Sequence, residues 1–148
     1  MITVIGLGVS VGDLTKRGEQ AIINAQKIGA PILVRTANTR SYQSVLDLGV
    51  EHVCLDDVYE SSRSFSTLAK NLAKRVAQAG ENAVYLVDGS ATEDNSVKAL
   101  CKPLRGKVEI IDGVSKVTSL VRLAGFDSCS YTAVSAYELL ERAQNGGL

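Results

Sequence analysis

The chain alternates short apolar runs with stretches of helical spacing, and this alternation limits its fold more than any other feature. Strands that alternate with helices form a parallel sheet covered by helices. The sequence therefore predicts an α/β fold of three layers, with a mainly parallel five-stranded sheet and helices on both faces. The expected strands occupy residues 2–8, 30–36, 50–56, 82–89 and 107–113.

Helices are expected between these strands, where apolar residues recur at helical spacing. Asp13 is expected to be the N-cap of the first helix, since its carboxylate can accept from first-turn amides. A length of 148 residues suits one domain over residues 1–148. The expected helices occupy residues 13–29, 38–49, 61–80, 96–104 and 115–125, and residues 131–144 are expected to run from a short strand into a helix.

Three of the expected strands end at glycine and turn toward a helix. Their loops read "GLGVSVGD", "VDGSATEDN" and "IDGVSK". Right-handed crossovers place the loops that follow parallel strands on one edge of the sheet, and ligands of open α/β sheets bind at that edge. The loops therefore predict a shelf where backbone N–H groups approach a small ligand. The alternative is that these glycines only allow tight turns.

Composition narrows the class of protein. The formal net charge is zero, with 45% apolar and 22% charged residues. Without a basic excess or a Lys/Arg cluster, a nucleic-acid partner is not expected. The apolar runs are too short to span a bilayer, and the chain starts directly with a strand pattern rather than a signal peptide. We therefore expect no membrane partner and a cytoplasmic location.

The cysteines and the one histidine do not suggest a metal site. Cys54, Cys101 and Cys129 are scattered and form no CxxC pair, so with His52 they make no zinc ligand set. We expect three packing thiols and no metal. His52 and Cys54 would share one face of a strand, so a catalytic Cys–His pair is one hypothesis. A surface or hydrogen-bonded histidine is the plainer interpretation.

The spacing Gly6-x-Gly8-x-x-x-Gly12 resembles the dinucleotide-binding fingerprint. An NADP-binding oxidoreductase is therefore one hypothesis. The second strand ends in Arg35 rather than an acidic residue, which at best suits a 2′-phosphate. No nearby pair of residues offers proton chemistry, and the chain has no room for a substrate domain.

Together, the three loops and their order resemble the N-terminal domain of the tetrapyrrole (corrin/porphyrin) methylase family. The resemblance is closest to the version fused to a MazG-type nucleotide pyrophosphohydrolase, and it covers nearly the whole chain. It rests on "ITVIGLG…GDLTKRGEQAI", "PILVRT", "VCLDDVYESSRSFSTLAKNLAKRV", "NAVYLVDGS" and "VEIIDGVSKVTSLVRLAGFD".

The resemblance implies that the cofactor is S-adenosylmethionine and that its methyl group passes to a small-molecule acceptor. The catalytic residues are unknown, because methyl transfer needs chiefly the alignment of donor and acceptor. The cofactor-binding positions that carry over are Gly8, Val9, Asp88, Gly89, Ser90, Val114, Ser115 and Lys116.

The loops also depart from the family pattern. Val9 and Asp112 stand where the family has proline, and the second loop lacks both of its prolines, which predicts different loop hydrogen bonding. The family's second α/β domain is absent from this chain, so half of the active site is expected to be missing. A homodimer or a C-terminal domain would then cover the exposed face. The rival hypothesis is a degenerate, non-catalytic methylase domain that acts as a dimerisation or regulatory scaffold.

Overall fold

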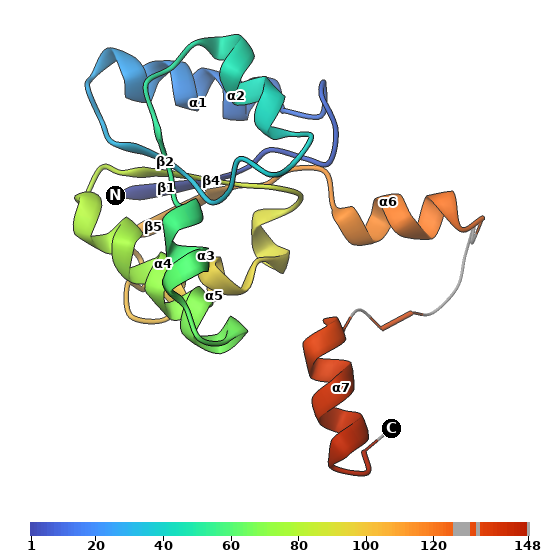
Figure 1. The fold of residues 1–148 in the computed structure, drawn as a ribbon. Helices are drawn as coiled ribbons and strands as arrows, with labels where there is room; N and C mark the ends of the chain where they lie inside the picture. Colours follow the sequence, from blue (N-terminus) through green and yellow to red (C-terminus); the bar gives the residue numbers. More distant parts are fainter. Residues whose placement is uncertain (126–130, 133, 148) are drawn as a thin grey trace. The chain divides into compact units, whose positions relative to one another are not determined.

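The computed structural model describes residues 1–125, 131, 132 and 134–147 (Figure 1). The chain divides into two compact units, Met1–Lys116 and Val117–Leu148, which are described separately. The first unit contains the whole sheet and the first five helices. A single domain over residues 1–148 stays a prediction.

The sheet has five strands in the order β3-β2-β4-β1-β5, and every neighbouring pair is parallel. This confirms the predicted fold class. In the middle of the sheet, Ile5 of β1 pairs with Leu86 of β4 on one side and with Ile111 of β5 on the other. The strands are β1 (Ile2–Gly6), β2 (Ile32–Val34), β3 (Val53–Cys54), β4 (Val84–Val87) and β5 (Val108–Ile111).

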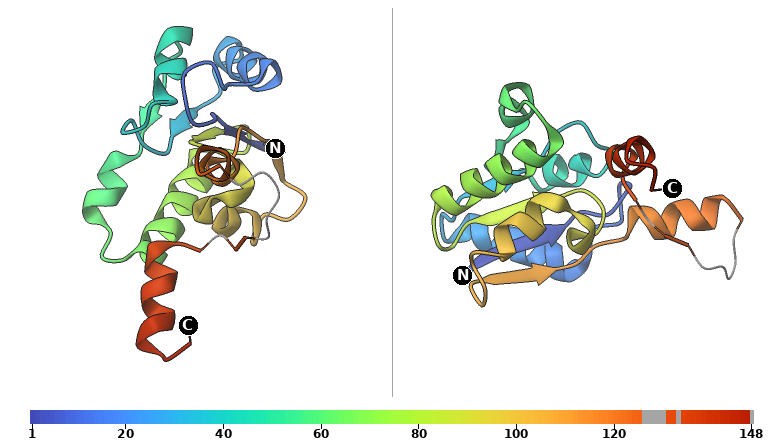
Figure 2. Two further views of the ribbon diagram at one scale, coloured as in Figure 1. Left: turned by 90° about the vertical axis from the view of Figure 1, so that its right-hand side faces the viewer. Right: turned by 90° about the horizontal axis from the view of Figure 1, so that it is seen from below.

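Helices cover both faces of the sheet (Figure 1). Helices α1 (Lys16–Lys27) and α2 (Tyr42–Leu48) lie on one face. Helices α3 (Asp56–Ser61), α4 (Phe65–Ala79) and α5 (Asn95–Cys101) lie on the other, and the view from below shows α4 and α5 in front of the strands (Figure 2).

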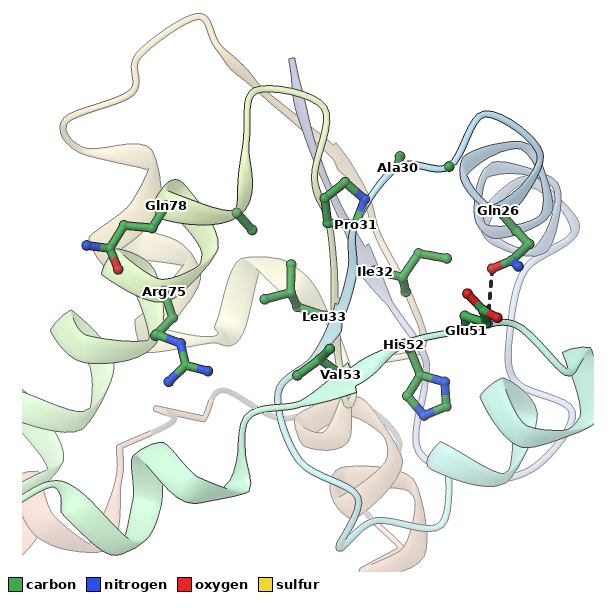
Figure 3. A pocket seen from close by; sticks show the side chains of 12 residues that line it. Gln26, Ala30, Pro31, Ile32, Leu33, Glu51, His52, Val53, Arg75 and Gln78 are labelled. Atoms are coloured by element: carbon green, nitrogen blue, oxygen red, sulfur yellow. Dashed lines mark hydrogen bonds between the residues drawn. The ribbon is translucent and has the colours of Figure 1, made fainter.

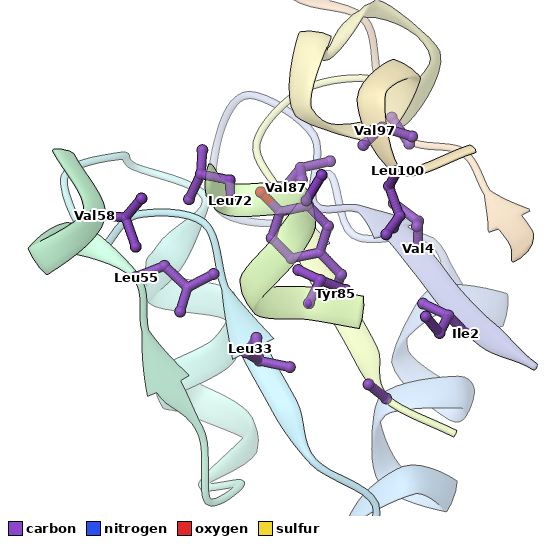
Figure 4. Packing of buried hydrophobic residues seen from close by; sticks show 14 of the residues in the cluster. Ile2, Val4, Leu33, Leu55, Val58, Leu72, Tyr85, Val87, Val97 and Leu100 are labelled. Carbon is purple, nitrogen blue, oxygen red and sulfur yellow. The ribbon is translucent and has the colours of Figure 1, made fainter. Parts of the chain in front are cut away.

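Each face of the sheet has its own buried core, because side chains of a strand alternate between the two faces. On the side of α4 and α5, the ring of Tyr85 lies among aliphatic side chains such as Leu72 and Leu100 (Figure 4). The Tyr85 hydroxyl is 2.8 Å from Ser96 Oγ. On the side of α1 and α2, Leu86 and Ile22 belong to a second apolar cluster.

Two expectations about helix starts were wrong. The N-cap of α1 is Thr15, whose hydroxyl oxygen accepts from the Gly18 amide at 3.0 Å, and not Asp13. The single helix expected over residues 61–80 does not begin at Ser61, which instead ends the unexpected helix α3. Ser64 starts α4 by accepting from the Thr67 amide, so polar caps divide this segment.

The second unit contains α7 (Ala136–Gln144) and most of α6 (Lys116–Leu123). Every residue of these two helices is described, and none has a buried side chain. The described residues between 131 and 135 form no strand, so the expected closing strand is not seen there, while the helix after it is confirmed. None of the described helices combines the length and apolar character that crossing a membrane requires.

Replacing Leu72 tests the core on the α4 side. Leu72→Ala should lower the free energy of unfolding by about 3 kcal/mol, because it removes apolar contacts and leaves a cavity. Leu46→Ala is the control, since Leu46 is 47% exposed on α2 while Leu72 is fully buried. Urea unfolding measures both variants, and equal losses would contradict the assignment of Leu72 to the core.

Candidate functional site

The candidate site lies at the carboxyl edge of the sheet, between the neighbouring strands β1 and β4. The chain leaves β1 toward α1 on one face and leaves β4 toward α5 on the other. Loops that diverge in this way from adjacent strands form the crevice where open α/β sheets bind ligands.

Three glycines bring the backbones of β1, β4 and β5 into contact at this edge. A Cβ on Gly6 would lie 2.6 Å from the Gly89 oxygen and 2.7 Å from the Gly113 nitrogen. A Cβ on Gly113 would lie 2.5 Å from the Gly6 oxygen. Only glycine allows such close approach. The prediction that the three loops meet at one edge is therefore confirmed, and we call this junction the glycine rim.

Gly8 and Gly89 are bonded to each other across the rim. The Gly8 amide donates to the Gly89 oxygen at 3.2 Å, and the Gly89 amide donates to the Gly8 oxygen at 2.7 Å. Both glycines have a positive φ, +78° at Gly8 and +70° at Gly89. The loops that diverge from β1 and β4 are thus joined by their own backbones.

Asp13 closes the first loop. Its Oδ2 accepts from the amides of Val9 at 3.0 Å and Ser10 at 2.9 Å. Consecutive amides that converge on one oxygen form an anion-binding nest. In this chain the nest holds a carboxylate of the protein itself, which explains why Asp13 does not cap α1.

Asp112 joins the second loop to the third. Its carboxylate accepts from the Ser90 hydroxyl and the Ala91 amide, both at 2.8 Å, from the Gly113 amide at 3.0 Å and from the Thr92 hydroxyl at 3.1 Å. Burial raises the pKa of Asp112, but the hydrogen bonds outweigh burial and hold the pKa below its ordinary value. The residue that replaces the family's proline therefore supplies an ionised acceptor.

A charged cluster borders the glycine rim where β2 and β4 end. Lys116 Nζ donates to Asp88 Oδ2 at 2.8 Å. Arg35 lies 3.0 Å from Asp94 and 3.8 Å from Asp88, and its guanidinium is 5.4 Å from the centre of the Tyr59 ring. Burial lowers the pKa of Arg35, but the negative charge of Asp94 and the other neighbouring groups raise it by more. The net pKa therefore lies above its ordinary value, and Arg35 stays charged.

The structure brings most of the predicted site residues together. Gly8, Val9, Asp88, Gly89 and Ser90 have the contacts given above. Ser115 donates to Glu93 at 2.5 Å, and Val114 is exposed in the third loop, two residues before α6. No ligand tests their predicted role in cofactor binding, which stays a prediction.

Sequence reasoning did not foresee how the carboxylates are used. Asp94 caps α5 by accepting from the amides of Ser96 and Val97. It also pairs with Arg35, which had been considered only as a partner for a 2′-phosphate. The signal that could have shown this pair is a cation directly after β2 together with acidic residues after β4, the strand beside it.

Tyr42 lies between His52 and Cys54. Its hydroxyl is 2.9 Å from His52 Nε2 and accepts from the Cys54 thiol at 3.6 Å, while His52 Nδ1 is 2.8 Å from the Val50 oxygen. The His52 ring is therefore hydrogen-bonded on both sides, as the plainer interpretation predicts.

Cys54 and Cys101 are partly buried free thiols, and Cys129 lies outside the described residues. Among the described residues, no three His, Cys, Asp or Glu side chains are grouped to hold a metal ion.

A large open pocket of about 740 Å³ lies at the other end of the sheet (Figure 3). It is lined by residues that precede β2 and β3, such as Pro31 and Glu51, and by the end of α4. The Glu51 amide donates to Gln26 at 3.0 Å, and Arg75 is paired with Asp57. The pocket shares no residue with the glycine rim, so the topology and not the cavity size identifies the candidate site.

The family profile described as Tetrapyrrole (Corrin/Porphyrin) Methylases matches residues 1–145. The chain therefore belongs to the tetrapyrrole methylase family. No curated protein matches the sequence.

Solved structures share the fold. A crystal structure of diphthine synthase is similar with a TM-score of 0.52 and 23% identity, over 84% of this chain and 48% of that one. Uroporphyrin III C-methyl transferase from Thermus thermophilus has a TM-score of 0.53 and 19% identity, over 83% of this chain and 47% of that one. Precorrin-6Y methylase from Archaeoglobus fulgidus has a TM-score of 0.51 and 18% identity, over 86% of this chain and 59% of that one. The chain thus spans about half the length of the first two.

Replacing Gly113 tests the glycine rim. Gly113→Ala should lower the free energy of unfolding by about 3 kcal/mol, because its Cβ would overlap the backbone of β1. Gly147→Ala is the control, since a Cβ there lies 3.6 Å from its nearest neighbour, an ordinary contact. Chemical denaturation compares the two, and a Gly113 variant as stable as the control would show that the loops do not touch.

The Asp112 hydrogen bonds predict a pH dependence. The folded pKa lies below the unfolded value of about 3.9, so the stabilisation is present above that pH and is lost as pH falls through the folded pKa. Asp112→Asn should lower the free energy of unfolding by about 1 kcal/mol at pH 7, a value that allows for the solvent exposure of the carboxylate. The loss should become smaller as the pH falls toward 3.

Urea unfolding across this pH range measures the effect. Glu81→Gln is the control, since Glu81 is exposed and the described part of the chain gives it no hydrogen bond or ion pair. If the difference in unfolding free energy between wild type and Asp112→Asn did not vary with pH, the ionised Asp112 carboxylate would not be the source of the stabilisation.

Proposed function

We propose that the glycine rim is an S-adenosylmethionine site and that the chain is a methyltransferase-like domain, incomplete on its own. The observation that carries the proposal is the contact of three glycine loops at the switch point of a tetrapyrrole methylase family domain. The structural neighbours include a methyl transferase and a methylase, which is consistent with the proposal.

In this proposal, Gly8, Gly89, Ser90 and Ser115 contact the cofactor through backbone or hydroxyl groups. Val9, Asp88, Val114 and Lys116 border the same site. S-adenosylmethionine, when bound, supplies an electrophilic methyl group. The chain's own part is to bind and orient this group, which needs no dedicated acid or base.

The charge at the rim suits a cationic ligand. Asp88, Asp94 and Asp112 are carboxylates at this edge, and the cations beside them, Arg35 and Lys116, are already paired. A sulfonium is attracted to such a site, whereas an acceptor that carries many carboxylates is repelled. We therefore propose a small methyl acceptor that is not a polycarboxylate.

A second candidate is the non-catalytic scaffold. It is favoured by one observation: the rim amides at Gly8, Val9, Gly89 and Ala91 all donate to acceptors of the protein itself. A degenerate domain would be closed in this way permanently. The NADP-binding oxidoreductase gains no such support, since Asp13 fills the amide nest of the first loop and Arg35 is paired with Asp94.

The partner and context are also proposals. The chain covers about half of the first two structural relatives, so a C-terminal α/β domain or a second copy in a homodimer would supply the other wall of the site. Fusion to a MazG-type pyrophosphohydrolase and a cytoplasmic location rest on the sequence alone.

Calorimetry with S-adenosylhomocysteine tests the proposed function. We expect saturable binding at or below millimolar ligand, accompanied by a rise in melting temperature. Asp88→Asn should weaken binding about tenfold by removing a charged acceptor. Asp47→Asn should leave binding unchanged, because within the part of the chain that the structure describes the Asp47 carboxylate accepts only from Gln43 on α2. Absence of heat and of a thermal shift would favour the scaffold, and a fluorescence change with NADPH would favour the oxidoreductase.

A further inference from the structure

The side chain of Lys116 lies across the glycine rim. A Cβ added to Gly89 would be 2.9 Å from both Cγ and Cε of Lys116, so the lysine's carbon chain covers the outer side of this glycine. Its ammonium is held by Asp88, 2.8 Å from Oδ2. Lys116 thus occupies the space directly above a backbone that is proposed to contact the cofactor.

We propose that Lys116 is a latch that closes the glycine rim, and that a ligand enters over Gly89 by displacing the Lys116 ammonium from Asp88. The proposal rests on the proposed function and assigns Lys116 a role opposite to the one implied by family resemblance. A cofactor-binding lysine stabilises the bound state, whereas a latch stabilises the free state.

The latch can open at small cost. The side chain of Lys116 is 49% exposed and that of Asp88 is 13% exposed, so the released ammonium moves into water. Ion pairs with one exposed member contribute little to stability. Asp88 does not become an isolated buried charge, because Arg35 stays 3.8 Å from its Oδ1.

The other internal contacts of the rim are less suited to opening. Asp13 bonds two amides of its own loop, and Asp112 bonds four donors from the second and third loops. Releasing either carboxylate would leave two backbone amides unpaired. Lys116, by contrast, has a flexible side chain, and within the described residues one hydrogen bond, to Asp88, holds it at the rim.

Opening the latch also defines the ligand chemistry. Asp88 Oδ1 is buried and, among the described residues, has no hydrogen-bond partner. Loss of Lys116 would free Oδ2 as well. A ligand that carries a cationic group, such as the ammonium of an amino-acid moiety, would replace the lysine charge and bond the carboxylate. The rim therefore favours a ligand whose own cationic group takes the place of the Lys116 ammonium at Asp88.

Binding to Lys116 variants of the chain tests the latch. Lys116→Ala should tighten S-adenosylhomocysteine binding about fivefold, the equivalent of about 1 kcal/mol for a half-exposed pair. Lys116→Arg should retain wild-type affinity. Lys98→Ala is the matched control, an exposed lysine on α5 for which the described residues provide no ion pair. Unchanged or weaker binding by Lys116→Ala would overturn the latch.

A second measurement does not need the ligand. Lys116 covers Gly89, whose amide donates to the Gly8 oxygen. Loss of the lysine side chain should give water access to this hydrogen bond, so hydrogen exchange of the Gly89 amide should accelerate in Lys116→Ala and stay at the wild-type rate in Lys116→Arg and Lys98→Ala. If no variant binds S-adenosylhomocysteine, the proposed function fails and exchange alone decides on the latch. An unchanged Gly89 exchange rate in Lys116→Ala would then overturn it.

Discussion

The backbones of Gly6, Gly89 and Gly113 lie so close together that a β-carbon on Gly6 or Gly113 would overlap a neighbouring loop. This contact draws the ends of β1, β4 and β5 into one junction at the carboxyl edge of the sheet. The parallel order β3-β2-β4-β1-β5 makes the contact possible, because it places β1 between the other two strands. The charged groups of the candidate site are all arranged around this junction.

Closure by internal acceptors distinguishes this rim from a simple open shelf. Asp13 and Asp112 occupy backbone donors, and Gly8 and Gly89 bond each other. A ligand of the rim must therefore compete with contacts that the protein already makes. This competition separates the two main hypotheses, since a methyltransferase-like domain must open the rim and a scaffold keeps it closed.

The sequence was sufficient for the fold class, five parallel strands with helices on both faces, because strands and helices alternate along the chain. It also located the loops of the site, since parallel strands send such loops to one edge. It did not predict that Asp13 bonds the amides of its own loop. A helix N-cap and an acceptor for loop amides both call for a short carboxylate side chain, so the residue type alone does not distinguish the two roles. It also missed α3: the expected helix begins at Ser61, where α3 ends, and the hydrogen bond that the Ser64 side chain accepts places the start of α4 at Phe65. Pairing of Arg35 with Asp94 depends on which strands are neighbours, which local patterns do not contain.

Nitrogen-15 NMR of the chain during titration with S-adenosylhomocysteine tests most directly whether the three loops form one binding rim. The account predicts that the amides of Gly8, Gly89 and Gly113 shift together along one saturation curve. Shifts confined to one loop, or centred on Glu51 and His52 in the distant pocket of Figure 3, would contradict it.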